Sequence, residues 1–329
     1  MKVAATSATV AALTGCGSLP DSALPPAAEP ASSPPLTARP AGRVVAVGRK
    51  PEGVAADPAT GLAAVALREP ASVALVDTTT GRVRRRVAVP GAARHLQLAQ
   101  PGGPVLVPAE PAARLVRIGL PDGATTSVQT GRQPHDAARA GSRDFVANEL
   151  DSSLSVFASR RRVAQIRTAL QPGGVASADQ GRKVALISVR ARRLELFDAV
   201  TLRRVGSVAA GTGPTHVVSD GGNYLYVVDT KAGAVLVFRI VPELHLLRRY
   251  PLPGSPYGIA FDPAARRLWV TDTARNQLVE LTAGARPRAL RRFPTVRQPD
   301  SVAVEARSGL VLVTGKVAGV LQLLDPRTR

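Results

Sequence analysis

The chain has 329 residues, with 43 Lys and Arg against 24 Asp and Glu, a net charge of +19, a single Cys and 3% aromatic residues. One Cys excludes a disulfide framework and a zinc or iron–sulfur site built from several cysteines. No run of 18 or more apolar residues occurs, so the sequence predicts no membrane-spanning helix. Hydrophobic residues make up 45% of the chain, which indicates that most of it folds around a core.

The first 16 residues have the pattern of an export signal. Lys2 gives a positive start, and a short stretch of Ala, Val and Leu follows it. Leu13-Thr14-Gly15-Cys16 then resembles the bacterial lipobox, in which a small residue precedes the cysteine that receives the lipid. The resemblance implies that residues 1–16 are a lipoprotein signal peptide, that Cys16 is lipidated, and that the protein is anchored to the extracytoplasmic face of the cell membrane. The alternative is an incidental cysteine in a frayed terminus.

Residues 17–42 are rich in Pro and Ala, with seven prolines in 26 residues. Such a segment forms neither helix nor sheet, because proline lacks the backbone N–H that both need. We expect a disordered, semi-rigid tether of polyproline type between the lipid and the folded domain.

A repeat fills residues 43–329. A turn leads into a short apolar strand seven times, at spacings of 38 to 43 residues. The aligned positions are Pro51, Ala93, Pro134, Pro172, Pro214, Pro256 and Pro299. Three further strands follow each turn, and the fourth is often rich in Arg, as in RVRRRVAV from residue 82. Helical periodicity is missing throughout.

Four strands in about 41 residues, repeated, are typical of a β-propeller blade. The sequence therefore predicts an all-β, seven-bladed β-propeller with four-stranded blades over residues 43–329. The seventh unit ends after three strands. We expect residues 43–47 to supply the fourth by pairing with residues 319–324, which closes the ring and removes an open edge.

The units resemble the YVTN/NHL-type propeller repeat. Residues 51–83 (PEGVAADPATGLAAVALREPASVALVDTTTGRV) and 256–281 (PYGIAFDPAARRLWVTDTARNQLVEL) carry the likeness most clearly. The resemblance implies the fold and leaves the activity open, because such propellers include surface and scaffolding proteins, nucleic-acid binders, lactonases and lyases.

A functional site is expected where the first strands converge on the central channel. The loops that enter the first strands and those between second and third strands open on the same face. From these loops we select as ligand-binding candidates Glu52, His95, His135, Asp136, His216, Tyr257 and Asp300. The competing interpretation is that these side chains are turn formers and polar groups of the channel rim.

Catalysis at this face would use imidazoles and carboxylates as acid, base or ligands of a divalent cation. His135 and Glu149 are the catalytic candidates, because streptogramin-lyase-type propellers use a His and a metal-linked Glu placed similarly. Blade register alone produces the same spacing between His95 and Glu110. A gluconolactonase-type metal site would use Glu52, Asn148 and Asp272, although the family's entry motif is missing. The sequence favours a binding role over catalysis.

The positive charge gathers in the fourth strands as pairs and triplets of Arg. Arg on an exposed edge discourages aggregation, and it also attracts anionic envelope polymers or lipid headgroups. Nucleic acid is a poor partner for an exported protein with so few aromatic residues. The resulting hypothesis is a lipid-anchored propeller that binds a protein or small-molecule ligand, or acts as a scaffold, at the cell envelope. A metal-dependent lactonase- or lyase-like enzyme is the alternative.

Overall fold

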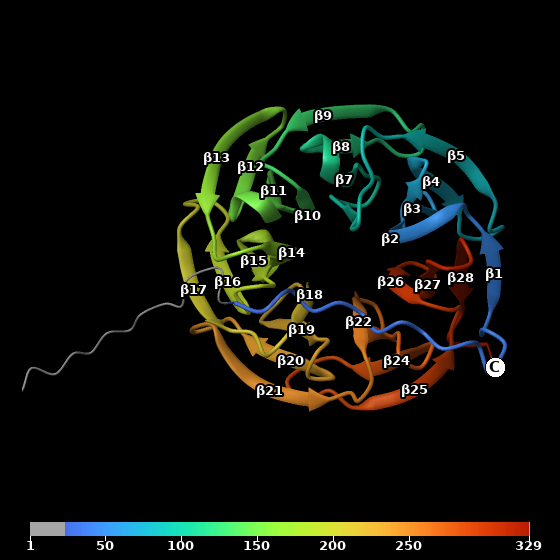
Figure 1. The fold of residues 1–329 in the computed structure, drawn as a ribbon. Helices are drawn as coiled ribbons and strands as arrows, with labels where there is room; N and C mark the ends of the chain where they lie inside the picture. Colours follow the sequence, from blue (N-terminus) through green and yellow to red (C-terminus); the bar gives the residue numbers. More distant parts are fainter. Residues whose placement is uncertain (1–23, 329) are drawn as a thin grey trace, which may run out of the picture.

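The computed structural model describes residues 24–328 as seven four-stranded antiparallel sheets arranged around a central axis (Figure 1). The expected signal peptide and Cys16 lie outside the described residues. Within the described range the predicted seven-bladed, all-β fold is confirmed.

The strands of the first four blades follow the chain in order from the axis outward. Blade 1 is β2 (Arg49–Asp57), β3 (Leu62–Glu69), β4 (Ala71–Asp77) and β5 (Val83–Ala88), and blade 2 is β6 (Gln97–Leu98), β7 (Val105–Ala109), β8 (Arg114–Ile118) and β9 (Thr125–Gln129). Blade 3 is β10 (Pro134–Ala140), β11 (Arg143–Asn148), β12 (Ser153–Ala158) and β13 (Arg161–Arg167), and blade 4 is β14 (Pro172–Ala178), β15 (Lys183–Ser188), β16 (Arg193–Asp198) and β17 (Arg204–Ala209).

The remaining three blades repeat this order, and the last one takes its outer strand from the start of the domain. Blade 5 is β18 (Pro214–Ser219), β19 (Tyr224–Asp229), β20 (Ala234–Arg239) and β21 (His245–Pro251), and blade 6 is β22 (Pro256–Asp262), β23 (Arg267–Asp272), β24 (Gln277–Thr282) and β25 (Ala289–Pro294). Blade 7 is β26 (Pro299–Glu305), β27 (Leu310–Gly315), β28 (Val320–Leu324) and β1 (Arg43–Ala46).

The closing strand behaves as the repeat predicts. β1 pairs with β28 in antiparallel register, Arg43 opposite Leu323 and Ala46 opposite Val320. Thr314 in β27 adds a contact across the closure, because its hydroxyl donates to the carbonyl of Glu52 in blade 1 at 2.7 Å. The last blade is thereby joined to the first on both its outer and its inner side.

The hydrophobic cores lie between neighbouring blades. One cluster joins Leu194 and Leu196 of blade 4 to Leu225, Val227 and other apolar side chains of blade 5, and similar clusters recur around the ring. Trp269 is the largest fully buried side chain and belongs to the cluster between blades 6 and 7. Because each sheet packs on two neighbours, the inner strands are fixed in position around the axis.

Regular helix among residues 24–328 is limited to three short 3₁₀ turns, η2 (Glu110–Ala112), η3 (Glu149–Asp151) and η4 (Asp179–Gly181). This part of the chain holds no helix with the length and hydropathy needed to cross a membrane. Two of the turns, η2 and η3, follow second strands and begin with a buried Glu.

Residues 24–42 differ from the expected disordered tether. They cross one face of the ring as an extended segment, which we call the strap (Figure 1). Loops of the propeller bond to its backbone: Ser255 Oγ accepts from Ala31 N at 2.9 Å, and the side-chain amide of Gln298 bonds to Ala31 O and Ser33 N. The physical reason is that a polyproline backbone leaves its polar groups free, so side chains of the face loops can satisfy them.

Ser33 anchors the strap. Its side chain is buried, and its hydroxyl donates to Thr273 O at 2.6 Å and accepts from Gln298 N at 3.1 Å. Asn276 donates to Pro34 O, and Arg190 donates to Leu24 O. The strap is therefore held along much of its length by blades 4, 6 and 7.

The Arg-rich fourth strands lie on the outside of the ring, as expected from their place in the repeat. The exposed arginines of these strands are Arg84, Arg85, Arg86, Arg161, Arg162, Arg204, Arg248, Arg249, Arg291 and Arg292. Several of them pair with carboxylates of the neighbouring third strand, such as Arg291 with Glu280 at 2.6 Å.

Candidate functional site

Three imidazoles from three blades meet at the channel axis. His95 precedes β6, His135 lies in β10 and His216 lies in β18. The Nε2 atoms of His95 and His135 are 3.0 Å apart, and the ring centroids of His95 and His216 are separated by 4.8 Å. Tyr257 of β22 packs edge-on against His216 at 4.6 Å. Side chains that are far apart in the sequence are thus stacked into one layer across the channel.

Close approach of the inner strands makes this layer possible. Gly53 in β2 lies against the backbone before β6, where an added Cβ would be 2.7 Å from Arg94 O and 2.9 Å from His95 Cα. Only a residue without a side chain fits at this distance, so Gly53 sets how near His95 lies to blade 1. Gly258 has the same role toward Asp300, whose carbonyl oxygen would be 2.4 Å from an added Cβ.

The surroundings of His135 favour its charged form. Its Nδ1 lies 3.2 Å from Glu149 Oε1 and 3.4 Å from Glu110 Oε1, and all three side chains are buried. Burial by itself lowers the pKa of an imidazole, but the negative charges of Glu110 and Glu149 outweigh it and raise the pKa of His135. The geometry therefore favours the imidazolium form at this position.

The two neighbouring imidazoles are neutral. Burial, followed by the charge of His135, lowers the pKa of His95 well below its usual range and that of His216 to about 3. Only one of two facing Nε2 atoms can carry the shared proton, so His135 donates to His95 in the 3.0 Å contact. A charged acid and a neutral base therefore lie in direct hydrogen-bond contact.

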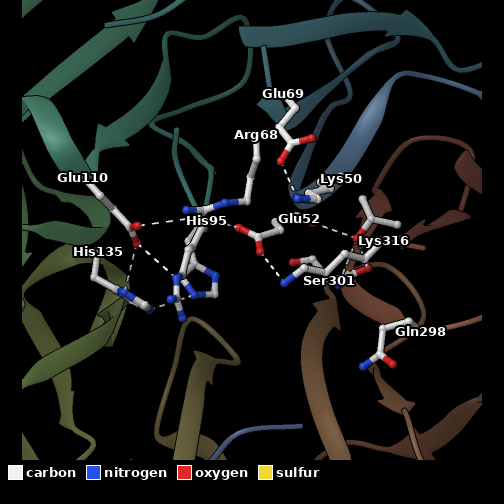
Figure 2. Close-up of polar contacts among 12 residues, drawn as sticks. Lys50, Glu52, Arg68, Glu69, His95, Glu110, His135, Gln298, Ser301 and Lys316 are labelled. Atoms are coloured by element: carbon white, nitrogen blue, oxygen red, sulfur yellow. Dashed lines mark hydrogen bonds and ion pairs between the residues drawn. The ribbon is translucent and has the colours of Figure 1, made fainter. Parts of the chain in front are cut away.

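A second group of charges lies beside the imidazoles, toward blades 1 and 7. Figure 2 shows Arg68 between Glu52 and Glu110, with its Nη1 at 2.8 Å from Glu52 and 3.8 Å from Glu110. Lys316 forms an ion pair with the other oxygen of Glu52. Burial raises the pKa of Glu52, but the hydrogen bonds and charges of Lys316 and Arg68 outweigh it, so its pKa is lowered.

At Asp300, in contrast to Glu52, the effect of burial on the pKa outweighs the effect of nearby positive charges. Burial raises its pKa to about 7, because the positive charges of Lys316 and Arg94 only partly compensate. Burial likewise raises the pKa of Tyr257 well above 10. The axis therefore combines charged, neutral and nearly half-protonated groups within one small space.

Two small cavities open beside these groups under the strap. One, of about 90 Å³, is lined by the expected residues Glu52, His95, His216, Tyr257 and Asp300, and by Glu29 and Pro30 of the strap. The other, of about 150 Å³, is lined by His135 and Glu149 together with His95 and His216. Six of the seven ligand-binding candidates are thus brought together.

Asp136 is the exception among these candidates. Its carboxylate accepts from Val175 N at 2.9 Å and from the Gln97 side chain at 3.0 Å, and it lines a different cavity on the far side of the imidazole layer. The reason is that these bonds hold Asp136 against Val175 and Gln97, which also line that cavity.

The structure does not bring the three metal candidates Glu52, Asn148 and Asp272 together. Asn148 is buried among Ser153, Ser155 and Gly131 within its own blade, and Asp272 accepts from Ser255 N and Arg275 in blade 6. Both side chains fix turns, and only Glu52 faces the channel. Within residues 24–328, no group of three or more His, Cys, Asp or Glu side chains is placed to hold a metal ion.

Two residues of the site, Arg68 and Glu110, were not predicted to contribute to it. Arg68 lies at the end of β3 and joins Glu52 to Glu110. The one signal for Arg68 in the sequence was its position at the end of a second strand, which places it on the channel face. Glu110 contacts His135 of the next blade and not His95 of its own blade. The sequence spacing between His95 and Glu110 therefore did not predict the Glu110–His135 contact.

Comparisons with known proteins establish the fold and nothing finer. No protein-family model and no curated protein matches the chain. Among solved structures, hydrazine synthase of Kuenenia stuttgartiensis superposes with a TM-score of 0.75 at 16% identity, covering 87% of this chain and 98% of that one. The β-propeller domain of Myceliophteria thermophila Cps50 gives 0.73 at 14%, covering 85% and 97%. A streptogramin B lyase gives 0.72 at 12%, also covering 85% and 97%.

The opposite protonation preferences predict a pH-dependent stability. Between pH 6.5 and 4, His216 takes up a proton in the unfolded chain but not in the folded one, because its folded pKa is about 3 against an ordinary 6.5. The stability due to this group is present above pH 6.5 and is lost as the pH falls, by up to about 1.4 kcal/mol per pH unit. His216→Asn should therefore lose less stability than the wild type on acidification, measured by urea unfolding.

The control for this comparison is His245→Asn, which removes an imidazole from the outer strand β21 instead of the axis. Parallel pH profiles for wild type and His216→Asn would contradict the neutral state assigned to His216.

Proposed function

We propose that the protein binds a small polar ligand at the axial layer of His95, His135 and His216. The observation that carries the proposal is a set of buried polar atoms at the imidazole layer that lack a hydrogen bond among the described residues. They are Arg94 Nε, Glu110 Oε1, His135 Nδ1 and His216 Nδ1. Leaving such groups unpaired costs about 1–3 kcal/mol each, a cost that a bound molecule with matching groups offsets.

The chemistry of these atoms defines the ligand. Arg94 and His135 offer charged donors, Glu110 offers an acceptor, and neutral His216 has one ring nitrogen free. The ion-pair contacts among them, 3.4 Å from Glu110 Oε1 to both Arg94 Nε and His135 Nδ1, lack the alignment of hydrogen bonds, so these donors and acceptor stay available. A ligand with both hydroxyl or amide groups and a carboxylate or phosphate would satisfy both kinds of partner.

Lyase-like acid–base chemistry is the second candidate, favoured by the contact between charged His135 and neutral His95. An elimination needs a base that removes a proton and an acid that protonates the leaving group, and these two imidazoles supply both. The fold of a streptogramin B lyase is compatible with this candidate. Chromatography after incubation with streptogramin B would reveal turnover.

The setting that we propose is the cell envelope. The lipobox at Cys16 supports a lipid anchor on the extracytoplasmic face, and the exposed Arg rows on the outer strands support contact with anionic envelope polymers. The ligand site is at the axis and the Arg rows are on the rim. Binding to the envelope and binding to a ligand would therefore use separate surfaces.

Ligand binding is tested by thermal unfolding in the presence of a panel of amino acids, dicarboxylates, sugar acids and sugar phosphates. A compound present at 100 times its Kd should stabilise the wild type by about 2.7 kcal/mol. His135→Gln should abolish this stabilisation, because the charged donor is lost, whereas His245→Gln should retain it. A stabilising compound whose effect survives His135→Gln would contradict binding at the axial layer.

The anchor is tested separately by Cys16→Ser, which removes the sulfur that would carry the lipid. We expect the variant to move from the membrane fraction to the soluble fraction of cells lysed in high salt, which screens the Arg rows. Retention of the variant in the membrane fraction under these conditions would contradict lipid anchoring at Cys16.

A further inference from the structure

The imidazole layer divides the channel into two unequal parts. His95 and His216 line the two small cavities under the strap, and both also line a cavity of about 580 Å³ on the opposite side. The loops at the mouth of this larger cavity include Gln180, Asp220 and Pro263, which connect first to second strands. These loops lie on the face opposite the strap.

The strap covers the imidazole layer on the side of the two small cavities. Glu29 and Pro30 form part of the wall of the smaller cavity, and Ala27, Ala28 and Glu29 line the other. Ser33 is buried with two hydrogen bonds, and Gln298 holds the strap backbone at Ala31 and Ser33. A molecule approaching from this face would have to break these contacts.

The larger cavity is open and mostly apolar along its length. Side chains of alternate residues on the inner strands face it, as with Ser177, which lies between Ala176 and Ala178 of the core. Ala56, Val218, Phe261 and Val304 add partly buried apolar surface. Gln97, Asp136, His95 and His216 form its polar inner end. A volume of this size matches a drug-sized small molecule.

We infer that the larger cavity is a second binding space, entered through the face opposite the strap, for a molecule with a mostly apolar body and one hydrogen-bonding end directed at His216. The inference goes beyond the proposed function, because Arg94, Glu110 and His135, which define the polar ligand, do not line this cavity. His216 lies at the inner end of the cavity, and burial keeps its imidazole neutral. The strap then acts as a fixed cover of the other mouth.

The inference is tested by alkylation of the full chain at pH 7. The probe is 4-bromophenacyl bromide, in which an apolar ring carries a reactive carbon. A neutral imidazole nitrogen bonds to that carbon, bromide leaves, and the ring proton goes to solvent. The four histidines fall on separate tryptic peptides, so mass spectrometry follows His216 on residues 205–231 and the outer-strand His245 on residues 240–248. The readout is the rate at His216 divided by the rate at His245.

We expect this ratio to be at least fivefold higher with the aromatic probe than with iodoacetamide, which is small and polar. Ser177→Trp, which narrows the open cavity, should lower the aromatic-probe ratio at least fivefold, and Ser219→Trp at the mouth is the second variant if the first fails to fold. Ser127→Trp on the exposed outer strand β9 is the matched control and should leave the ratio unchanged.

Strap variants decide between the two routes. Ser33→Glu loosens the strap at its buried anchor, and Ser32→Glu adds the same charge at the exposed neighbouring residue. Both should leave the ratio within twofold of the wild type. A ratio that rises with Ser33→Glu alone and is unaffected by Ser177→Trp would overturn the inference. That result would leave the proposed binding function standing, because that function rests on Arg94 and His135, which line the cavity under the strap.

Discussion

The charge on His135 is the interaction on which the candidate site depends. Two buried carboxylates, Glu110 and Glu149, lie within 3.4 Å of one ring nitrogen and oppose the effect of burial on its pKa. Once His135 is charged, its neighbours cannot be, because two like charges in such a confined space repel strongly. The pKa values of His95 and His216 are lowered for this reason as well as by burial. One ion cluster thus sets the protonation of the whole layer.

The ring closure is what brings this cluster together. His135 and Glu149 belong to one blade, whereas Glu110 comes from the blade before it and His216 from the blade two further on. Glycines of the inner strands, Gly53 and Gly258, let neighbouring blades approach closely enough for side chains to meet. The cores between blades then hold these positions, and Ala27 and Ala41 of the strap pack against two of those cores. The strap covers the assembled layer from one side.

Nearly all of the fold could be predicted from the sequence repeat. Its constant period and four short apolar runs determined the number of blades, and the missing fourth strand of the last unit required the pairing of β1 with β28. The His135–Glu149 contact followed from the same register, since both residues lie at the channel end of strands in one sheet. Contacts between blades could not be predicted in this way, because they depend on how closely two sheets pack.

Where the structure differs from the expectations, the differences have specific physical causes. Asn148 and Asp272 are not brought together with Glu52, because each accepts from the backbone N–H of a residue just before the first strand of its own blade. Asp136 lines a different cavity from His135 because its carboxylate accepts from the backbone of the next blade at Val175. The Pro-rich composition of residues 24–42 correctly indicates that they form no helix or sheet, but composition says nothing of the side chains on blades 4, 6 and 7 that bind the strap.

The most direct measurement is the protonation state of each histidine by ¹⁵N NMR of the imidazole nitrogens at pH 6.5–7. We expect His135 to show two protonated ring nitrogens, and His95 and His216 each to show one protonated and one unprotonated nitrogen. A neutral His135, or a charged His95 or His216 in the same pH range, would contradict the ion cluster on which the candidate site is built.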